Sequence, residues 1–470
     1  MTEDNQDEWL DYASAGYGGA IDPWEDLVPV DDSEESEDVL DDEDDFEDDT
    51  PALRDMEAPP CPAPMGIRHV IRLGACDHCL ARIGGRLNEG GLPAREHGAR
   101  IRVDAIERDS MLSEINTDYC PFCEDLFDDI QNIVVRILRE TEGVEFNTLQ
   151  MGHHISKELV EEEDYLRKRF GARGAPPLKA SFAAAVELAL KEKMTEINMV
   201  KEVPDVMILV DSLTLRVKAE VRPVFLYGRY RKMSREVPQT RWPCRACKGR
   251  DGGCTSCDMT GLQYLHSVQD LVGEPIRKLL EADDTSFHGM GREDIDVRCL
   301  GRGRPFVIEV KRPKKRTPDI EGLLASIAEG AEGLVEVDEL RPSTRPEVAR
   351  IKETKAEKSY RIRFAIEGDP LDQEDAEQRI LALSGVMLEQ RTPKRVAHRR
   401  SDLVRKRELV SIENIVVEDK EIQFDVRCQT GTYVKEMVHS VDGRTTPSVA
   451  EVLERACEVL WLDVLEIHAE

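Results

Sequence analysis

Residues 291–310 read GREDIDVRCLGRGRPFVIEV and are the most informative part of the chain. Three carboxylates, Glu293, Asp294 and Asp296, stand among four arginines and precede an apolar run at 306–308 that predicts a buried strand. A solvated network of ion pairs would explain such a mixture on most protein surfaces. Here three glycines permit close approach to the backbone, and basic residues continue beyond the strand. A polyanion is therefore the expected partner.

The charge of the chain is unevenly distributed. Its 470 residues carry a formal net charge of −31. A chain of this length can form two or three folded units. Residues 1–50 contain 22 Asp or Glu and no Lys or Arg, so the remainder has 73 acids and 64 bases. We interpret residues 1–60 as a disordered acidic tail, because so polar a segment cannot bury enough apolar surface to offset its ordering entropy. Such an acidic protein also suggests a high-salt cytosol.

Positive charge is concentrated in two places on this acidic background. Nine basic residues and one acid lie in 222–250, and eight basic residues and one acid lie in 391–407. Runs of this kind are usually only solvated, but their concentration in an acidic protein favours a local RNA contact. Tyr227 and Tyr230, which alternate with arginines, suit stacking on bases, although core tyrosines would give the same pattern. The candidate RNA-binding residues are Arg229, Arg231, Lys232, Arg235, Arg304, Arg399 and Arg400.

Eight of the twelve cysteines occur in Cys-x-x-Cys pairs. Four thiolates suit tetrahedral Zn²⁺, so both sets predict structural zinc sites. For the first set, whose pairs are 40 residues apart, two redox-active pairs are the alternative. For the compact, glycine-flanked second set at 244–257, an iron–sulfur cluster is the alternative. The candidate metal ligands are Cys76, Cys79, Cys120 and Cys123 in the first set and Cys244, Cys247, Cys254 and Cys257 in the second.

The order of elements predicts an α+β protein. A helix is expected at 181–197, opening on an N-cap serine, and strands at 206–210 and 213–221. We expect an α+β domain at 61–225 and a second domain at 226–470 that contains the cysteine knuckle. The opening residues do not show the charged and apolar pattern of a signal peptide, and no apolar run is long enough to span a bilayer, so we expect the protein to be cytoplasmic. No phosphate-cradling loop or dinucleotide fingerprint is present, and no organic cofactor is expected.

At residues 291–294 the sequence resembles the Gly-Arg-x-Asp signature of pseudouridine synthases. Extended through Gly303-Arg304-Pro305-Phe306, it is similar to the archaeal and eukaryotic tRNA pseudouridine(54/55) synthase family. The resemblance implies a pseudouridine synthase fold with a mixed, largely antiparallel sheet and makes Asp294 the catalytic aspartate. It also implies that the N-terminal α+β domain is a THUMP-like RNA-binding module. The acidic composition resembles that of haloarchaeal members.

Four further site residues follow from this resemblance, and three of them also have an ordinary structural explanation. Arg292 resembles the arginine near the flipped nucleotide, or forms a salt bridge. Tyr360, in an alternating strand, matches the tyrosine that stacks on the target base, or is a core residue. In the stretch GTYVKEM at 431–437, Lys435 occupies the place of the basic partner of the aspartate. Met437 replaces a leucine that packs on the uracil, or it simply packs inside a helix.

The implied activity is conversion of uridines 54 and 55 in the T arm of tRNA to pseudouridine by a monomer that also holds the acceptor end. A non-catalytic, zinc-stabilised tRNA-binding protein or chaperone would show the same basic stretches and cysteine knuckles without the chemistry. A THUMP-bearing methylase or thiolase would need a nucleotide or methyl-donor fold that the sequence does not contain. Asp294 distinguishes the enzyme from the binding protein, since only the enzyme needs its carboxylate.

Overall fold

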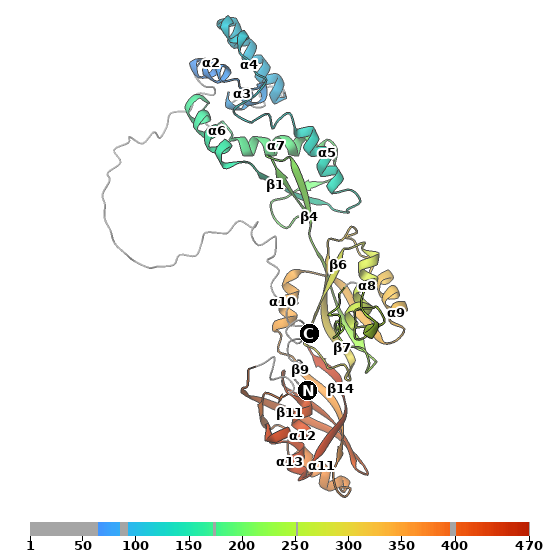
Figure 1. The fold of residues 1–470 in the computed structure, drawn as a ribbon. Helices are drawn as coiled ribbons and strands as arrows, with labels where there is room; N and C mark the ends of the chain where they lie inside the picture. Colours follow the sequence, from blue (N-terminus) through green and yellow to red (C-terminus); the bar gives the residue numbers. More distant parts are fainter. Residues whose placement is uncertain (1–63, 85–92, 173–174, 251, 395–400, 470) are drawn as a thin grey trace, which may run out of the picture. The chain divides into compact units, whose positions relative to one another are not determined.

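The computed structural model describes residues 64–469 apart from 85–92, 173–174, 251 and 395–400. The described chain forms two compact units that divide between Arg222 and Pro223, each with its own sheet (Figure 1). The expected acidic tail lies outside the described residues. None of the helices in the described part of the chain is both long and apolar enough to cross a membrane.

The first unit packs helices against a small sheet. Its sheet has the order β2-β1-β3-β4, in which β1 is parallel to β2 and β3, and β4 is antiparallel to β3. The strands are β1 (Thr148–His154), β2 (Asn198–Met199), β3 (Val206–Asp211) and β4 (Arg216–Val221). The helices are α2 (Pro64–Arg72), α3 (Asp77–Ile83), α4 (Ala94–Arg108), η4 (Ser110–Glu114), α5 (Ile130–Glu140), α6 (Lys157–Phe170) and α7 (Leu178–Lys191).

The second unit is built on a ten-stranded sheet. The order along it is β13-β10-β11-β12-β9-β14-β7-β5-β8, and β6 pairs with β7 off this path. Only β14 and β7 pair in parallel, so the prediction of a mixed, largely antiparallel sheet is confirmed. The strands are β5 (Val224–Lys232), β6 (Asp284–Gly289), β7 (Arg298–Lys311), β8 (Val335–Ser343), β9 (Glu357–Ile366), β10 (Met387–Arg391), β11 (Val404–Glu418), β12 (Glu421–Cys428), β13 (Thr445–Thr446) and β14 (Cys457–His468).

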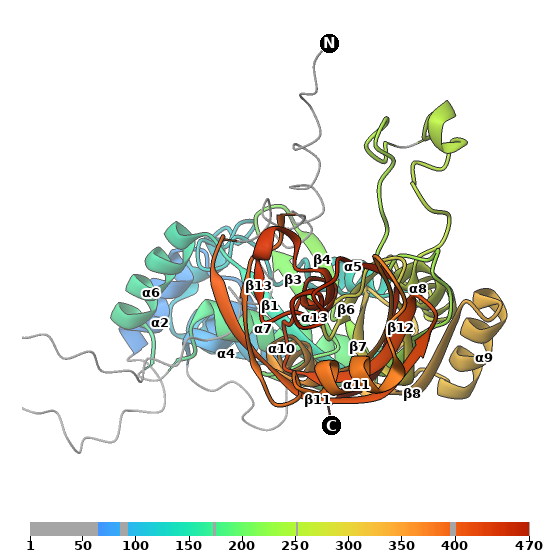
Figure 2. The ribbon, with the colours of Figure 1, turned by 90° about the horizontal axis from the view of Figure 1, so that it is seen from below.

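Helices cover this sheet at both ends of the strand order. Contacts join α8 to α9 and α9 to β8 at one end, and α11 to β11 at the other. Residues 241–265 leave the body of the unit as a long loop that carries the second cysteine set (Figure 2, yellow-green). The helices are α8 (Val268–Leu279), α9 (Ile320–Ala331), α10 (Arg345–Glu353), α11 (Gln373–Leu381), α12 (Val434–His439) and α13 (Val449–Leu453), with short 3-10 turns η5 (Thr255–Cys257) and η7 (Val441–Gly443).

Strand β7 takes part in two apolar cores of the second unit. Its Val307 belongs to the core formed with β9, β12 and β14. Its Phe306 and Ile308 belong to the core formed with β5, α8 and α9. Neighbouring side chains of a strand point to opposite faces of the sheet, which is why the two sets separate. The strand is buried on both faces, as the apolar run at 306–308 predicted.

Three strand patterns were predicted correctly, whereas the strand expected at 213–221 begins only at Arg216, as β4, and one helix also differs in its bounds. The strand over 206–210 and the alternating runs from Tyr360 and from Ile422 are β3, β9 and β12. The helix expected at 181–197 begins earlier, at Leu178, and ends at Lys191. Pro177 directly precedes the first residue of α7. A proline is tolerated there because the N–H that it lacks would have no partner within the helix, so the helix begins after Pro177. The expected N-cap serine lies one turn inside the helix.

Candidate active site

The loop between β6 and β7 presents the three carboxylates. It starts at Gly291, whose φ of +77° is a left-handed conformation that favours glycine. The amide of Val297 donates to the carbonyl of Asp294 at 3.1 Å, which closes a turn before β7. The amide of Met290 donates to Pro305 of β7 at 2.9 Å. The loop is therefore bonded to β7 at its beginning and closed by its own turn at its end.

Glu293 points into the protein and anchors the loop. Its carboxylate is 1% exposed and lies 2.9 Å from Nε of Arg304, which is 2% exposed. The hydroxyl of Tyr230 donates to Glu293 at 2.9 Å, and Nε2 of Gln239 donates to that hydroxyl at 2.7 Å and to the carbonyl of Gly291 at 3.0 Å. Burial alone would lower the pKa of Arg304, but the charge of Glu293, together with Tyr230 and Cys299, outweighs burial and raises that pKa.

Lys232, at the end of β5, binds the backbone carbonyls of the same loop. Its buried Nζ donates to the carbonyls of Ile295 at 2.7 Å, Asp294 at 3.3 Å and Val237 at 2.9 Å. Burial lowers the pKa of Lys232, while the charge of Glu293 opposes that shift. The backbone on either side of the Asp294 side chain is thus fixed by groups that do not reach solvent.

Asp294 itself is exposed and faces a lysine from another element. Its side chain is 49% exposed, and its Oδ2 lies 3.6 Å from Nζ of Lys435, the second residue of α12. The same Nζ lies 2.9 Å from Oδ2 of Asp296. Burial acts to raise the pKa of Asp296, but Lys435 outweighs it and the pKa is lowered. The structure therefore brings the expected aspartate and the expected basic partner together, and adds Asp296 as a nearer partner.

The other expected substrate-binding residues differ in their surroundings. Tyr360 lies on β9, half-buried beside the core, and burial raises its pKa. Arg292 is exposed, with its guanidinium carbon 5.8 Å from the ring centre of Trp242. Met437 is 0% exposed within the core of the second unit. Packing of Met437 on a base does not fit that burial, whereas the alternative of helix packing does.

The expected RNA-binding arginines and lysine also fall into groups. Arg229, Lys232 and Arg304 are buried and bonded to backbone or to Glu293, so a direct contact with RNA phosphates does not fit their placement. Arg231 and Arg235 are partly exposed. Arg231 pairs with Glu336 and Asp338 of β8, and Arg235 pairs with Asp463 of β14. Arg399 and Arg400 lie outside the described residues.

Sequence reasoning missed the anchoring role of Glu293, Lys232 and Gln239. Composition marks charged residues as surface groups, and only the fold reveals that these side chains turn inward. One signal was available for Tyr230, because core packing was the stated alternative to base stacking. The tyrosine is 0% exposed, and Tyr227 is 4% exposed.

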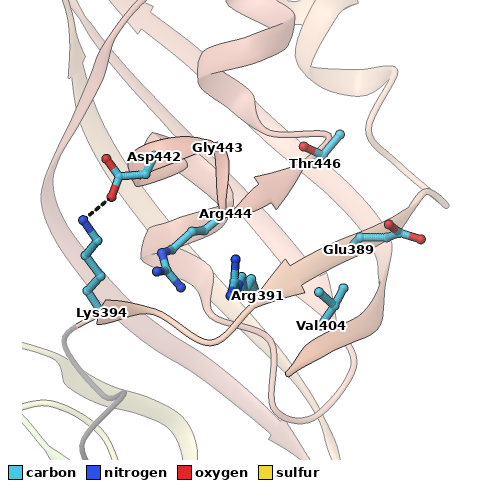
Figure 3. A pocket seen from close by; sticks show the side chains of 8 residues that line it. All are labelled: Glu389, Arg391, Lys394, Val404, Asp442, Gly443, Arg444 and Thr446. Atoms are coloured by element: carbon cyan, nitrogen blue, oxygen red, sulfur yellow. Dashed lines mark ion pairs between the residues drawn. The ribbon is translucent and has the colours of Figure 1, made fainter. Parts of the chain in front are cut away.

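A pocket of about 480 Å³ lies elsewhere in the second unit, between β10, β11, η7 and β13 (Figure 3). Its charged groups are already paired: Lys394 with Asp442 at 2.6 Å, and Arg391 with Asp402 at 2.6 Å. None of the residues around Asp294 lines it. It is lined by Glu389, Arg391, Lys394, Val404, Asp442, Gly443, Arg444 and Thr446.

Both cysteine sets form compact clusters. In each, the four Sγ atoms lie within 4.8 Å of one another, as the ligands of one tetrahedral ion must. The first set brings together two pairs that are 40 residues apart in sequence, on either side of α4. That convergence contradicts two separate redox pairs. The donor set of four thiolates fits zinc in both places.

Comparison with known proteins identifies the family. Residues 225–468 match the family model described as Pus10, C-terminal, and residues 133–211 match the Pus10 THUMP domain, archaeal. A tRNA pseudouridine synthase Pus10 from Methanothrix thermoacetophila is 39% identical over 343 residues, covering 72% of this chain and 74% of that protein. One from Halorubrum lacusprofundi is 35% identical over 402 residues, covering 84% and 93%.

The chain is only slightly similar to a solved structure. A crystal structure of a Cbf5-Nop10-Gar1 complex contains a chain with 17% sequence identity and a TM-score of 0.27, covering 41% of this chain and 43% of that one. This match carries no argument. The family models and the relatives define the class, which is that of the pseudouridine synthases, a group of isomerases. Within that class, the chain belongs to the Pus10 family.

Proposed function

We propose that this enzyme converts uridines 54 and 55 in the T arm of tRNA to pseudouridine, with Asp294 as the nucleophile. The observation that carries the proposal is the exposed Asp294 carboxylate, which lies on a loop anchored from inside and faces Lys435. The tRNA substrate is supported by the names of the two relatives described above, both of which are tRNA pseudouridine synthases. The chain covers 93% of the Halorubrum protein, so it includes nearly all of that relative.

The reaction is an isomerisation that needs a placed carboxylate and little else. The bond between N1 of uracil and C1′ of the ribose breaks, the base turns, and a bond forms between C5 and C1′. Asp294 attacks C1′ of the ribose as its bond to N1 breaks, and the carboxylate leaves C1′ again when C5 attacks that carbon. Lys435 fixes the direction of the carboxylate. The anchor formed by Glu293 and Arg304 keeps that geometry while the substrate enters.

The target uridine must leave the folded arm to reach Asp294. We propose that Tyr360 stacks on the extruded base and that the exposed Arg292 contacts the nucleotide. Among the predicted RNA-binding residues that the structure describes, Arg231 and Arg235 remain partly exposed and are suited to phosphate contacts. The THUMP domain would hold the acceptor end of the tRNA. We expect one chain to suffice, because the described site draws on β5, β7, β9 and α12 of a single unit.

Each cysteine cluster would hold one Zn²⁺ with a structural role. Four thiolates fill all positions of a tetrahedral ion and leave none for substrate. The ligands would be Cys76, Cys79, Cys120 and Cys123 in the first unit and Cys244, Cys247, Cys254 and Cys257 in the second.

The test is to incubate the full chain with unmodified tRNA transcript and map every pseudouridine by carbodiimide chemistry. Asp294→Asn should abolish the product, by about 10⁴-fold or more for a lost nucleophile, while tRNA affinity is retained. Asp369→Asn, an exposed aspartate outside the site, is the matched control. Transcripts with cytidine at position 54 or 55 report on each uridine separately.

Two outcomes would count against the proposal. Pseudouridine formation by the Asp294→Asn variant would remove the aspartate from the chemistry. Tight tRNA binding by the wild-type chain with no pseudouridine at either position would favour the binding protein or chaperone instead.

A further inference from the structure

Lys358 lies beside the loop that carries Asp294, on the same face of β9 as Tyr360. Residues at alternate positions of a strand share a face, and further along that row Ile362 and Phe364 are fully buried. Lys358 and Tyr360 are two positions apart along the strand, which is a separation of about 7 Å. The row thus runs from the apolar core to the two polar residues next to the site.

The ammonium group of Lys358 approaches the start of the loop. A Cβ atom placed on Gly291 would lie 3.4 Å from Nζ of Lys358 and 3.3 Å from Nη1 of Arg304. In the sheet, Lys358 is paired with Cys428 of β12 and Ile467 of β14, both 1% exposed. Its charge is therefore held inside the sheet rather than on an exposed edge.

No carboxylate in the described part of the chain forms an ion pair with Lys358. The acid that acts on its pKa, Glu293, is already engaged by Arg304 and Tyr230. Burial, and then the charge of Arg304, lower the pKa of Lys358 to about 8. The charged and titratable groups that act on it are Arg304, Glu293, Cys299 and Cys428, which also act on the phenol of Tyr360. A half-buried cation that forms no ion pair with a described carboxylate is suited to an anion supplied by the substrate.

We propose that Lys358 is a further catalytic residue, whose ammonium group donates a hydrogen bond to a carbonyl oxygen of the target uracil and stabilises the ring as it becomes an anion. This inference rests on the proposed function of the site. The base is favoured over a phosphate because an extruded base enters the interior, whereas the nucleic acid backbone stays at the surface. The proposed stacking partner, Tyr360, is the next residue on the same face.

The electrons of the reaction show where such a hydrogen bond acts. When the N1–C1′ bond breaks, its electron pair stays with uracil, and the negative charge spreads over N1 and the carbonyl oxygens. Forming the C5–C1′ bond uses an electron pair of the ring and releases the Asp294 carboxylate from C1′, after which C5 loses a proton and N1 gains one. Lys358 only donates a hydrogen bond, so no proton is consumed at this residue. A donor aimed at charge that develops in the transition state accelerates the reaction rather than tightening binding.

The experiment compares the full-length wild type with Lys358→Met and Lys358→Arg in single-turnover pseudouridine formation and in tRNA binding. Lys358→Met should slow the rate by about 100-fold or more, the usual effect of losing one such donor, with tRNA affinity unchanged. Lys355→Met, an exposed lysine three residues earlier, is the matched control and should behave as the wild type. The rate of the wild type should fall as pH rises through about 8, because the pKa of Lys358 is lowered to that value and the charged form is lost above it. Lys358→Arg should keep part of the activity and lose that fall.

Each contrary result has a distinct meaning. An unchanged rate for Lys358→Met, or weaker tRNA binding with an unchanged rate, would overturn the inference, and the second result would indicate a phosphate contact. If Lys358→Met does not fold, as judged by its thermal melt, the decision passes to Lys358→Arg: retention of the wild-type alkaline fall overturns the inference. A wild-type chain that forms no pseudouridine would refute the proposed function and not the role of Lys358 within it.

Discussion

The side chains of Glu293, Asp294 and Asp296 lie within four positions of one another, yet they are 1%, 49% and 53% exposed. The buried one anchors the loop, and the two exposed ones share Lys435. Sequence alone could not divide these roles, because all three carboxylates have arginines nearby. Their separation arises from the turn after Gly291, which directs alternate side chains inward and outward.

The buried pair of Glu293 and Arg304 should contribute strongly to stability. Glu293→Gln leaves the guanidinium of Arg304 buried without a counter-charge, so we expect a loss of about 3–5 kcal/mol in the free energy of unfolding. The measurement is urea unfolding of the full chain, followed by fluorescence. Asp296→Asn removes an exposed pair and serves as the control, with an expected change of about 1 kcal/mol or less. Equal losses in the two variants would contradict the anchor.

At the scale of elements, alternation of polar and apolar residues predicted β9 and β12 correctly, because each strand has one face in the core. The expected proximity of Asp294 and Lys435 also agrees with the structure. Burial within basic stretches could not be predicted. In β5, Arg229 and Lys232 turn inward because loop and strand carbonyls there need donors. Amino-acid composition does not show which buried carbonyl groups need a hydrogen-bond donor.

The cysteine knuckle in the loop of residues 241–265 depends on one tightly packed glycine. A Cβ on Gly253 would lie 2.3 Å from the backbone of Met259, whereas one on Gly252 would meet nothing within 4 Å. Both glycines have positive φ, so both alanine variants carry similar backbone strain. We expect Gly253→Ala to release zinc at lower chelator concentration than Gly252→Ala, as measured with a zinc-sensitive dye. Identical release would show that the close contact does not position the ligands.

On the scale of the whole molecule, net charge dominates the expected response to salt. The formal charge of −31 includes −22 from residues 1–50. Because self-repulsion opposes compaction and is screened by salt, we expect the melting temperature to rise with KCl concentration. Deleting residues 1–50 should reduce that dependence, since the rest carries only −9. High thermal stability at low salt, with no increase on adding KCl, would contradict this expectation.

Strand β7 has a consequence for how the second unit could be rearranged. It directly follows the loop of Asp294, and its two faces supply residues to two different cores. A cut or permutation beside this strand would leave Asp294, the proposed nucleophile, attached to only half of its support. The unit should accordingly tolerate new chain ends after α11 or in the loop of residues 241–265. It should not tolerate them in the connection between β6 and β7. If the enzyme is split into complementing fragments, the loop of Asp294 and strand β7 should stay in the same fragment.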